Sequence, residues 1–441
     1  MDSLDLDLNA KKTHKGSSLN FMLLVIGRIV SGMGNSIFGF AIGLYILDLT
    51  GSATAFSITL SVSIIPGVIV NILAGAYVDK HNKKKIIVTT DILSGITVLM
   101  FLMVFALNSK SVVLIMIYTF IIGIIQALFS LAINSSIPDF VSKDNVSRAN
   151  STFQAINASI SIIGPITGAL AYKLLGIKIV ILLNGVGFII AGIAETFLIY
   201  EFNRLSTGTG GVKSYIEDIK VSLSYLNQNK ILKFFFILAA VLNFIYNPLL
   251  FIVIPFINYN IIKIDGLQLS LIQSSAAIGI IISAVIIMLN KEASRKLLSR
   301  FFTLFMLQAL LVLAWGFPEI PFFQGVSKWG ITITFCLILI LYGAMNTAQN
   351  IPVVTYFQLK IPDEIRARVI GVFSSALYIT TPLGMWVYGI LLERVKWTYI
   401  TFFSGLLMLG ISIIASRNIY YRTFLDQQKE SKGEVDIEVK I

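Results

Sequence analysis

The sequence predicts an all-α integral membrane protein with twelve transmembrane helices, and three observations support this prediction. Hydrophobic residues make up 56% of the 441 residues and charged residues only 13%, against roughly 25% charged in ordinary soluble domains. Long apolar stretches recur along almost the whole chain, and Lys and Arg gather in every second loop between them. A water-soluble fold could not bury so much apolar surface.

Each apolar stretch is long enough to cross a bilayer. A hydrocarbon core about 30 Å thick needs about 20 helical residues, because the helix rises about 1.5 Å per residue. The runs are continuous and lack the period of two that a membrane β-barrel would show, so helices are expected. The predicted spans are residues 19–47, 54–77, 85–107, 112–134, 149–173, 178–200, 232–258, 268–289, 298–317, 329–350, 369–392 and 398–420.

The loop charges predict that both termini are cytoplasmic. Most of the 34 Lys and Arg residues fall in the N-terminal segment, in every second loop and in the C-terminal segment, and basic residues concentrate on the cytoplasmic side of membrane proteins. An even number of spans agrees with termini on one side. The net charge of +11 then reflects topology and attraction to anionic membrane lipids, and no nucleic-acid partner is expected.

Chemistry based on histidine, cysteine or a metal has few residues available. His14 and His81 are the only histidines and fall in predicted cytoplasmic segments, while Cys336, the only cysteine, falls in the tenth span. The sequence therefore offers neither a disulfide nor a cysteine metal cluster. We expect no catalytic residue, no metal and no cofactor, and hence no enzyme.

An internal repeat divides the chain. Pro165 in the fifth span and Pro382 in the eleventh each follow a loop with one Ile-Pro and one Arg-Ala pair, which predicts two bundles of six helices. The expected parts are an N-terminal cytoplasmic tail (1–18), an N-terminal bundle (19–200), a cytoplasmic linker (201–231), a C-terminal bundle (232–420) and a C-terminal cytoplasmic tail (421–441). In the linker, Ile216, Ile219 and Leu223 share one helical face, so an amphipathic helix on the membrane surface is predicted.

The loop after the second span carries a recognisable pattern. It reads Gly75-Ala76-Tyr77-Val78-Asp79-Lys80-His81-Asn82-Lys83-Lys84-Lys85, which resembles the G-x-x-x-D-[RK]-x-G-[RK]-[RK] signature of the major facilitator superfamily. Asn82 stands where the signature has glycine, a replacement that asparagine allows because it tolerates a positive φ. The segments around Gly27-Arg28 and Arg148-Ala149 resemble the branch of macrolide-efflux-type and siderophore-export-type carriers. The resemblance implies a major facilitator fold and a transporter similar to drug:proton antiporters.

The resemblance also implies an ionic latch at the cytoplasmic ends of the helices. Such a latch would hold the two halves together in only one of the two conformations that a carrier needs. Its candidate residues are Gly75, Asp79, Lys80, Lys83 and Lys84. The alternative is that these lysines only set the topology.

Gly164-Pro165-x-x-Gly168 resembles the core of the fifth-span motif of antiporters. Proline kinks a helix, and glycines four residues apart let a neighbouring helix approach closely. Gly164, Pro165 and Gly168 are therefore candidates for a rigid pivot helix, with a purely structural kink as the alternative.

Polar residues in the first, fourth, seventh and tenth spans are candidates for the substrate cavity, since polar groups are expensive against lipid and these helices line the cavity in the superfamily. The alternative is that each bonds a neighbouring helix and touches no substrate. The candidates are Arg28, Ser31, Asn35, Gln126, Asn134, Asn243, Tyr246, Asn247, Tyr342, Asn346 and Gln349.

Three ionisable residues within spans are candidates for coupling transport to protons. Arg28 is the only basic residue that lies well inside a span, away from its ends, and it needs a partner, which Asp91 in the third span or Glu195 in the sixth could supply. Either acid could also be the carboxylate that binds the proton. The alternative is that either acid only caps the latch region.

These features predict a secondary active transporter of the cell membrane, which exports small amphipathic molecules by alternating access and is driven by protons. An importer or a lysophospholipid carrier of the same fold is the alternative, and a membrane receptor or scaffold without transport is the alternative from another class. We expect a monomer whose partners are its small-molecule substrate, protons and membrane lipids.

Overall fold

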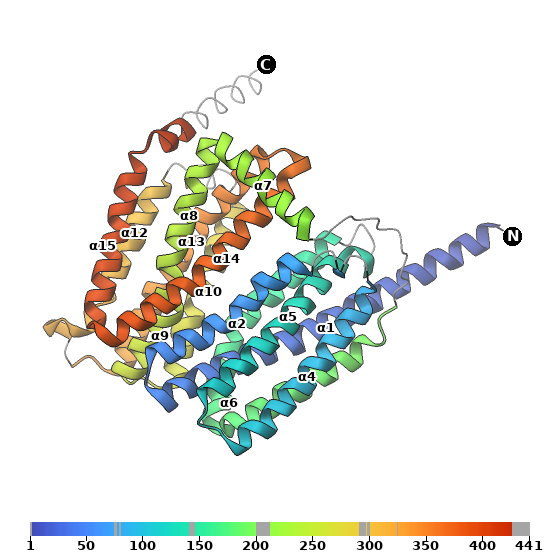
Figure 1. Ribbon diagram of the computed structural model, residues 1–441, viewed down its shortest axis with the longest axis horizontal. Helices are drawn as coiled ribbons and strands as arrows, with labels where there is room; N and C mark the ends of the chain where they lie inside the picture. The colour runs from blue at the N-terminus through green and yellow to red at the C-terminus, as the bar shows by residue number, and fades with distance from the viewer. Residues whose placement is uncertain are drawn as a thin grey trace. The chain divides into compact units, whose positions relative to one another are not determined.

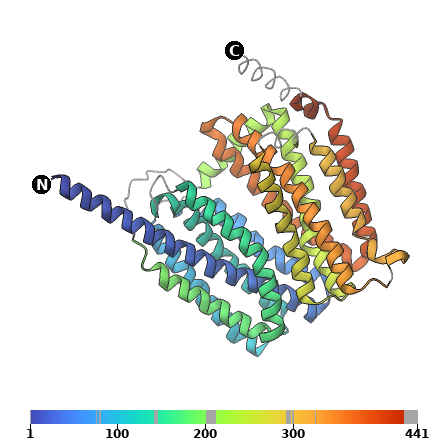
Figure 2. The ribbon, with the colours of Figure 1, turned by 180° about the vertical axis from the view of Figure 1, so that it is seen from behind.

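The computed structural model describes residues 2–74, 77–78, 81–140, 146–199, 212–290, 297, 300–323 and 325–425. Every regular element within these ranges is a helix (Figures 1 and 2). The chain forms two compact units, residues Met1–Tyr215 and Ile216–Ile441. The all-α membrane fold predicted from the sequence is thereby confirmed.

The first unit contains α1 (Asp2–Thr50), α2 (Ala53–Leu73), α4 (Lys83–Leu107), α5 (Val112–Phe140) and α6 (Val146–Glu195). Gly51, with a φ of 60°, separates α1 from α2. The Ser52 hydroxyl then caps α2 by accepting a hydrogen bond from the Ala55 amide at 3.0 Å. Within the unit, α6 packs along both α1 and α4, and α5 packs between α2 and α4 (Figure 1).

Asn82 is the N-cap of α4, and this corrects the role expected for it from the signature. Its φ is −64°, and its side chain accepts a hydrogen bond from the Lys85 amide at 3.1 Å. The position therefore needs no positive φ. A side-chain acceptor is what the first turn of α4 requires, because its amides have no partner inside the helix.

Helix α6 contains two of the predicted spans. Its backbone is non-helical at Gly176, where φ is 75° and ψ is 164°, a conformation that favours glycine. Before Gly176, Tyr172 donates a hydrogen bond to Asp48 near the end of α1. After Gly176, the side chain of Asn20, at the start of the membrane-spanning part of α1 (Leu19–Thr50), bonds the backbone of Ile199. The chain thus reverses direction at Gly176. Eleven described helical stretches are long and apolar enough to cross a membrane, and α6 supplies two crossings, which accounts for the twelve spans predicted.

The second unit contains the remaining helices. These are α7 (Val212–Gln228), which begins before the unit boundary, α8 (Lys230–Pro248), η2 (Leu249–Val253), α9 (Ile254–Phe256), η3 (Ile257–Ile261), α10 (Gly266–Leu289), α12 (Phe301–Ala314), η4 (Phe317–Glu319), η5 (Pro321–Phe323), α13 (Lys328–Lys360), α14 (Asp363–Arg394) and α15 (Trp397–Ser416). The main packed pairs are α10 with α13, α12 with α15, and α14 with α8 (Figure 1).

The seventh span is one continuous helical path with two wide turns. Helix α8 continues through η2, α9 and η3 to Ile261, and both η2 and η3 are π-helical. Pro248 and Pro255 lie at the starts of η2 and α9. Because proline has no amide hydrogen, it removes a donor from the regular ladder, and the helix widens locally.

An aromatic core closes one end of the second unit. Phe235 of α8 makes edge contacts with Phe301, Phe357 and Phe424 at centroid distances of 5.9, 6.3 and 5.1 Å. Leu226 of α7 is buried in the same cluster. The end of α7 is therefore anchored in this core, while the placement of α7 on a membrane surface stays a prediction.

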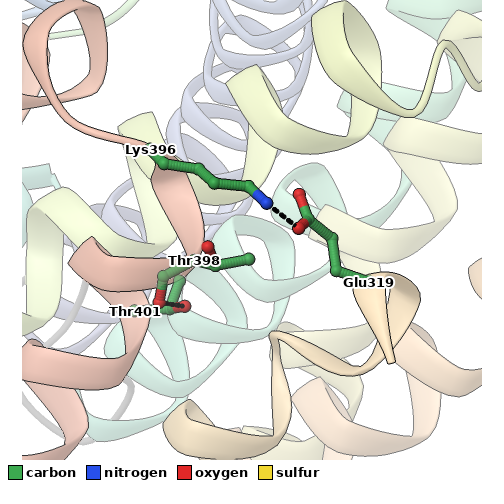
Figure 3. A network of polar contacts seen from close by, with 4 residues as sticks. All are labelled: Glu319, Lys396, Thr398 and Thr401. Atoms are coloured by element: carbon green, nitrogen blue, oxygen red, sulfur yellow. Dashed lines mark hydrogen bonds and ion pairs between the residues drawn. The ribbon is translucent and has the colours of Figure 1, made fainter. Parts of the chain in front are cut away.

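At the opposite end of α15, an exposed ion pair joins two loops. Lys396, immediately before α15, pairs with Glu319 of η4 (Figure 3). Figure 3 also shows Thr401 bonding back to the carbonyl oxygen of Thr398 within the first turn of α15, at 3.0 Å. The side chains of Lys396 and Glu319 are 56% and 35% exposed, so solvent screens their attraction.

We expect Lys396→Met to lower the stability of the protein by less than about 1 kcal/mol, since exposed ion pairs rarely contribute more. The change in thermal midpoint of the detergent-solubilised protein measures it. A matched Lys178→Met variant, at an exposed position just after Gly176, should behave almost identically. A large loss for Lys396→Met alone would mean that the ion pair holds the loops in place.

Candidate functional site

Polar side chains of α1, α4 and α5 bond one another inside the first unit. Ser31 donates a hydrogen bond to Asp91 Oδ2 at 2.7 Å. Asn35, one turn further along α1, donates to Gln126 Oε1 at 3.0 Å, and Gln126 donates to Ser94 Oγ at 2.9 Å. Three residues predicted to line a cavity therefore contact neighbouring helices directly, which is the alternative that the sequence left open for each of them.

Asp91 and Glu195 form a buried acidic pair. Asp91 lies on α4, and Glu195 lies on the second arm of α6, which follows Gly176 as the first arm precedes it. Both side chains are fully buried. Neither Glu195 oxygen has a hydrogen-bond partner among the described residues, and the same is true of Asp91 Oδ1. The two carboxyl groups are close enough to interact electrostatically. The sequence suggested the two acids as alternatives, and the structure brings them together.

Glycines make room for this acidic pair. A Cβ at Gly27 of α1 would lie 2.7 Å from Glu195 Oε1, and a Cβ at Gly192, one turn before Glu195, would lie 3.4 Å from Asp91 Cβ. The Glu195 carboxyl group thus rests against the α1 backbone. Larger side chains at these two positions would displace the acids.

Arg28 does not bond either acid in the described structure, which corrects the pairing expected from the sequence. Its Nε donates a hydrogen bond to Asn157 Oδ1, on the first arm of α6, at 3.1 Å. Adjacent helical residues point about 100° apart. Because Glu195 lies against Gly27, the Arg28 side chain leaves α1 in a different direction.

In the second unit, Asn243 and Asn247 of α8 bond Thr381 of α14. Asn247 Nδ2 donates to Thr381 Oγ1 at 2.7 Å, and Thr381 in turn donates to Asn243 Oδ1 at 3.2 Å. Asn247 also bonds Asn243. This triad ties α8 to α14 at the turn before Pro248 and Pro382.

We expect Thr381→Val to destabilise the protein by about 1 kcal/mol, because interhelical polar contacts in membrane proteins are typically worth about 0.6 and at most about 1.7 kcal/mol. Thr380→Val is the matched control. This substitution also replaces a hydroxyl group by a methyl group, and Thr380, like Thr381, bonds the Leu377 carbonyl oxygen of its own helix. The thermal midpoint of purified Thr381→Val should be lower than that of Thr380→Val. Equal midpoints would show that the triad does not contribute to stability.

Tyr342 and Gln349 of α13 are buried against α12. Gln308 of α12 donates a hydrogen bond to the Tyr342 carbonyl oxygen at 3.1 Å, and Gln349 donates to Gln308 Oε1 at 2.9 Å. The Tyr342 ring stacks on Tyr246 of α8, with centroids 4.9 Å apart. These residues link three helices within the second unit.

The two other cavity candidates have only neighbours on their own helices as described partners. Asn134 donates to Ser130 at 3.4 Å, and Asn346 accepts from Asn350 at 2.9 Å. Asn134 is exposed and Asn346 is half-buried. Both side chains are therefore available to a ligand.

Of the candidate latch residues, Gly75, Asp79 and Lys80 lie outside the described residues. Lys83 is described, and its Nζ donates a hydrogen bond to the Ser135 carbonyl oxygen at 2.9 Å. Lys84 is half-buried at the start of α4. The latch stays a prediction.

The two glycines of the candidate pivot lie against α1. A Cβ at Gly168 would lie 2.7 Å from the Ile37 carbonyl oxygen, and one at Gly164 would overlap the Ser36 side chain. In the second half, a Cβ at Gly384 of α14 would lie 2.7 Å from Pro248 Cγ of α8. Both repeats thus use glycine beside proline to bring two helices into close contact.

Comparison with known proteins identifies the family. The sequence profile of the Major Facilitator Superfamily matches residues 24–364. The chain belongs to the Major Facilitator Superfamily. It is accordingly a membrane transporter with many spans in the plasma membrane, and the transporter function predicted from its sequence is confirmed.

The relatives of this facilitator include exporters. Macrolide efflux protein A of Streptococcus pyogenes is 25% identical over 407 residues, which cover 90% of this chain and 95% of that protein. Multidrug efflux pump Tap of Mycolicibacterium fortuitum is 22% identical over 398 residues, with 88% and 94% covered. The resemblance to the macrolide-efflux type of carrier is therefore confirmed.

Solved structures support the fold of the facilitator. The nucleoside transporter NupG superposes with a TM-score of 0.69 at 16% identity, covering 90% of this chain and 99% of that one. A D-xylose-proton symporter superposes with a TM-score of 0.64 at 12% identity, covering 89% and 96%. At these identities the likeness concerns the fold alone.

Four polar residues at helix contacts of this facilitator were missed by the sequence reasoning: Ser94, Asn184, Gln308 and Thr381. Asn184 is buried, and Gly34 leaves room for it, since a Cβ there would lie 2.6 Å from Asn184 Oδ1. Each of the four stands in an otherwise apolar span. A polar residue in an apolar span is a signal that the sequence shows. These four residues were nevertheless missed, because they lie outside the four spans expected to line the cavity.

Proposed function

We propose that this facilitator exports small amphipathic molecules, of the macrolide or multidrug type, in exchange for protons. The export direction and the substrate class rest on the similarity to macrolide and multidrug efflux proteins over about nine-tenths of the chain. Substrates of this kind need an apolar path with a few polar groups. No catalytic step is part of the proposal.

Proton coupling rests on the buried pair of Asp91 and Glu195. Three of the four carboxyl oxygens of this pair have no hydrogen-bond partner among the described residues, so holding both acids as ions there would be costly. Buried acids within membrane spans mark proton relays. In the proposed cycle the pair binds one proton while open to the outside and releases it to the inside. Ser31, which bonds Asp91, links this event to α1.

Alternating access supplies the transport step. The two six-helix bundles expose the binding residues to one side and then to the other, with the Asp79 latch closing the cytoplasmic ends and the Gly164 and Gly168 contact keeping the first and fifth spans together. Both termini are cytoplasmic in this proposal, as the loop charges predict. Arg28, Asn134 and Asn346 are the polar candidates that the described contacts leave most available to substrate.

Transport into proteoliposomes tests the proposal. Purified full-length protein would be reconstituted, a pH gradient imposed, and uptake measured for labelled macrolides, cationic dyes, siderophores and lysolipids. We expect uptake of macrolides or dyes that disappears when a protonophore collapses the gradient. Uptake of lysolipid alone would favour the lysophospholipid carrier, uptake that ignores the gradient would reject proton coupling, and no uptake from the whole panel would favour the receptor or scaffold.

A further inference from the structure

A groove in the second unit opens between α8 and α15. Helix α8 packs mainly on α14, and α15 mainly on α12, so the start of α8 and the end of α15 leave a space of about 610 Å³ between them. This volume falls within the range of about 300–1,000 Å³ typical of ligand sites. The floor of the groove includes Leu238 and Ala415, which belong to the buried aromatic core. The groove therefore lies directly against the packed aromatic core.

The walls and the mouth of the groove differ in chemistry. Its walls are apolar, and Ile237, Val241 and Ile414 are 51%, 41% and 74% exposed. Its mouth carries Lys230 and Lys233, one turn apart on α8. A basic mouth above an apolar channel matches an anionic headgroup followed by an acyl chain.

The charge at the mouth has no described counter-ion. Both lysines are exposed, and neither has an ion pair or hydrogen bond among the residues for which contacts are described. They stand in the first turn of α8, which has no acidic residue. A helix start is the positive end of the helix dipole. An anion bound there would be stabilised by the two lysines and by the dipole together.

We propose that this groove binds one anionic phospholipid, whose phosphate contacts Lys230 and Lys233 and whose acyl chain lies along Ile237, Val241 and Ile414. Basic pockets between transmembrane helices recognise anionic headgroups. A soluble amphipathic substrate is a weaker fit, because the two helices that form the groove are both long and apolar enough to span a membrane, and basic residues at the end of such a span attract anionic lipid headgroups. The site is independent of the proposed transport function.

Native mass spectrometry of the full-length protein tests the site. After removal of bound lipid, the protein in detergent is titrated with phosphatidylglycerol or phosphatidylcholine, which differ in headgroup charge. We expect one phosphatidylglycerol to bind more tightly than phosphatidylcholine. In the double variant Lys230→Gln/Lys233→Gln its dissociation constant should rise about fivefold for each lysine removed, since each basic residue near the membrane surface contributes about 1 kcal/mol.

Two further variants control the experiment. Lys220→Gln/Lys360→Gln makes the same change of charge at exposed positions of the same unit outside the groove, and should leave binding unchanged. Ile237→Trp fills the groove without changing charge, and should weaken both lipids. The proposal fails if the groove double variant binds phosphatidylglycerol as the unmodified protein does, if the control pair loses as much affinity, or if the two lipids bind equally.

Discussion

Asp91→Asn is expected to abolish proton-driven accumulation of substrate. A gradient of one pH unit stores about 1.4 kcal/mol per proton and can support roughly a tenfold concentration ratio per proton exchanged. Asparagine keeps the size of the side chain and can still bond Ser31, but it cannot bind and release a proton. The accumulation ratio in proteoliposomes should therefore fall to about one, while exchange of labelled for unlabelled substrate without a gradient continues.

Glu195→Gln should have the same effect if the two acids share one proton. Glu217→Gln is the control, because Glu217 is an exposed acid on α7 with no place in the proposed relay, and it should retain full accumulation. Folding is checked by the thermal midpoint, which for the two buried variants should not fall, since a neutral amide is easier to bury than a charge. Normal accumulation by both Asp91→Asn and Glu195→Gln would remove the acidic pair from the mechanism.

Gly168→Leu is expected to damage the fold of the first unit severely. A Cβ there would already lie 2.7 Å from the Ile37 carbonyl oxygen and 3.2 Å from the Phe40 Cβ, so the first arm of α6 and α1 would have to separate. Overpacking of this kind typically costs about 1–3 kcal/mol, and more where backbone must move. We expect a fall of several degrees in the thermal midpoint and loss of transport.

Gly39→Leu provides the matched control for that variant. Gly39 lies on α1, and a Cβ there meets no atom within 4 Å, so the same added side chain should leave the thermal midpoint almost unchanged. If both variants were equally stable, the close contact between α1 and α6 would contribute nothing to the fold, and Gly168 would lose its role in a pivot.

The membrane fold follows from the sequence because its physical cause is simple. A run of about 20 apolar residues in a bilayer has few alternatives to a helix, and the predicted spans agree with the described helices to within a few residues over most of the chain. The turn at Gly176 was predictable as a short connection between two spans. Its backbone conformation was not, because the surrounding residues Leu174 to Lys178 contain no proline or other strong turn signal.

The candidate site was predictable in its residue types but not in its pairings. Polar residues in apolar spans identified Ser31, Asn35, Gln126, Asp91 and Glu195. Their partners depend on the rotation of each helix about its axis, which a single sequence does not determine when most faces of the helix are apolar. For this reason Arg28 was expected to contact an acid and instead bonds Asn157.

The wide turns of the seventh span have a mechanical consequence. Rewinding one π-helical turn of η2 or η3 into α-helical form would rotate all residues beyond it by about 100° and displace them by about 1.5 Å. Such a slip exchanges one set of backbone hydrogen bonds for another, so little bonding is lost. The far end of this span can therefore rotate about the helix axis, while the Asn243 and Asn247 contacts hold its near end to α14.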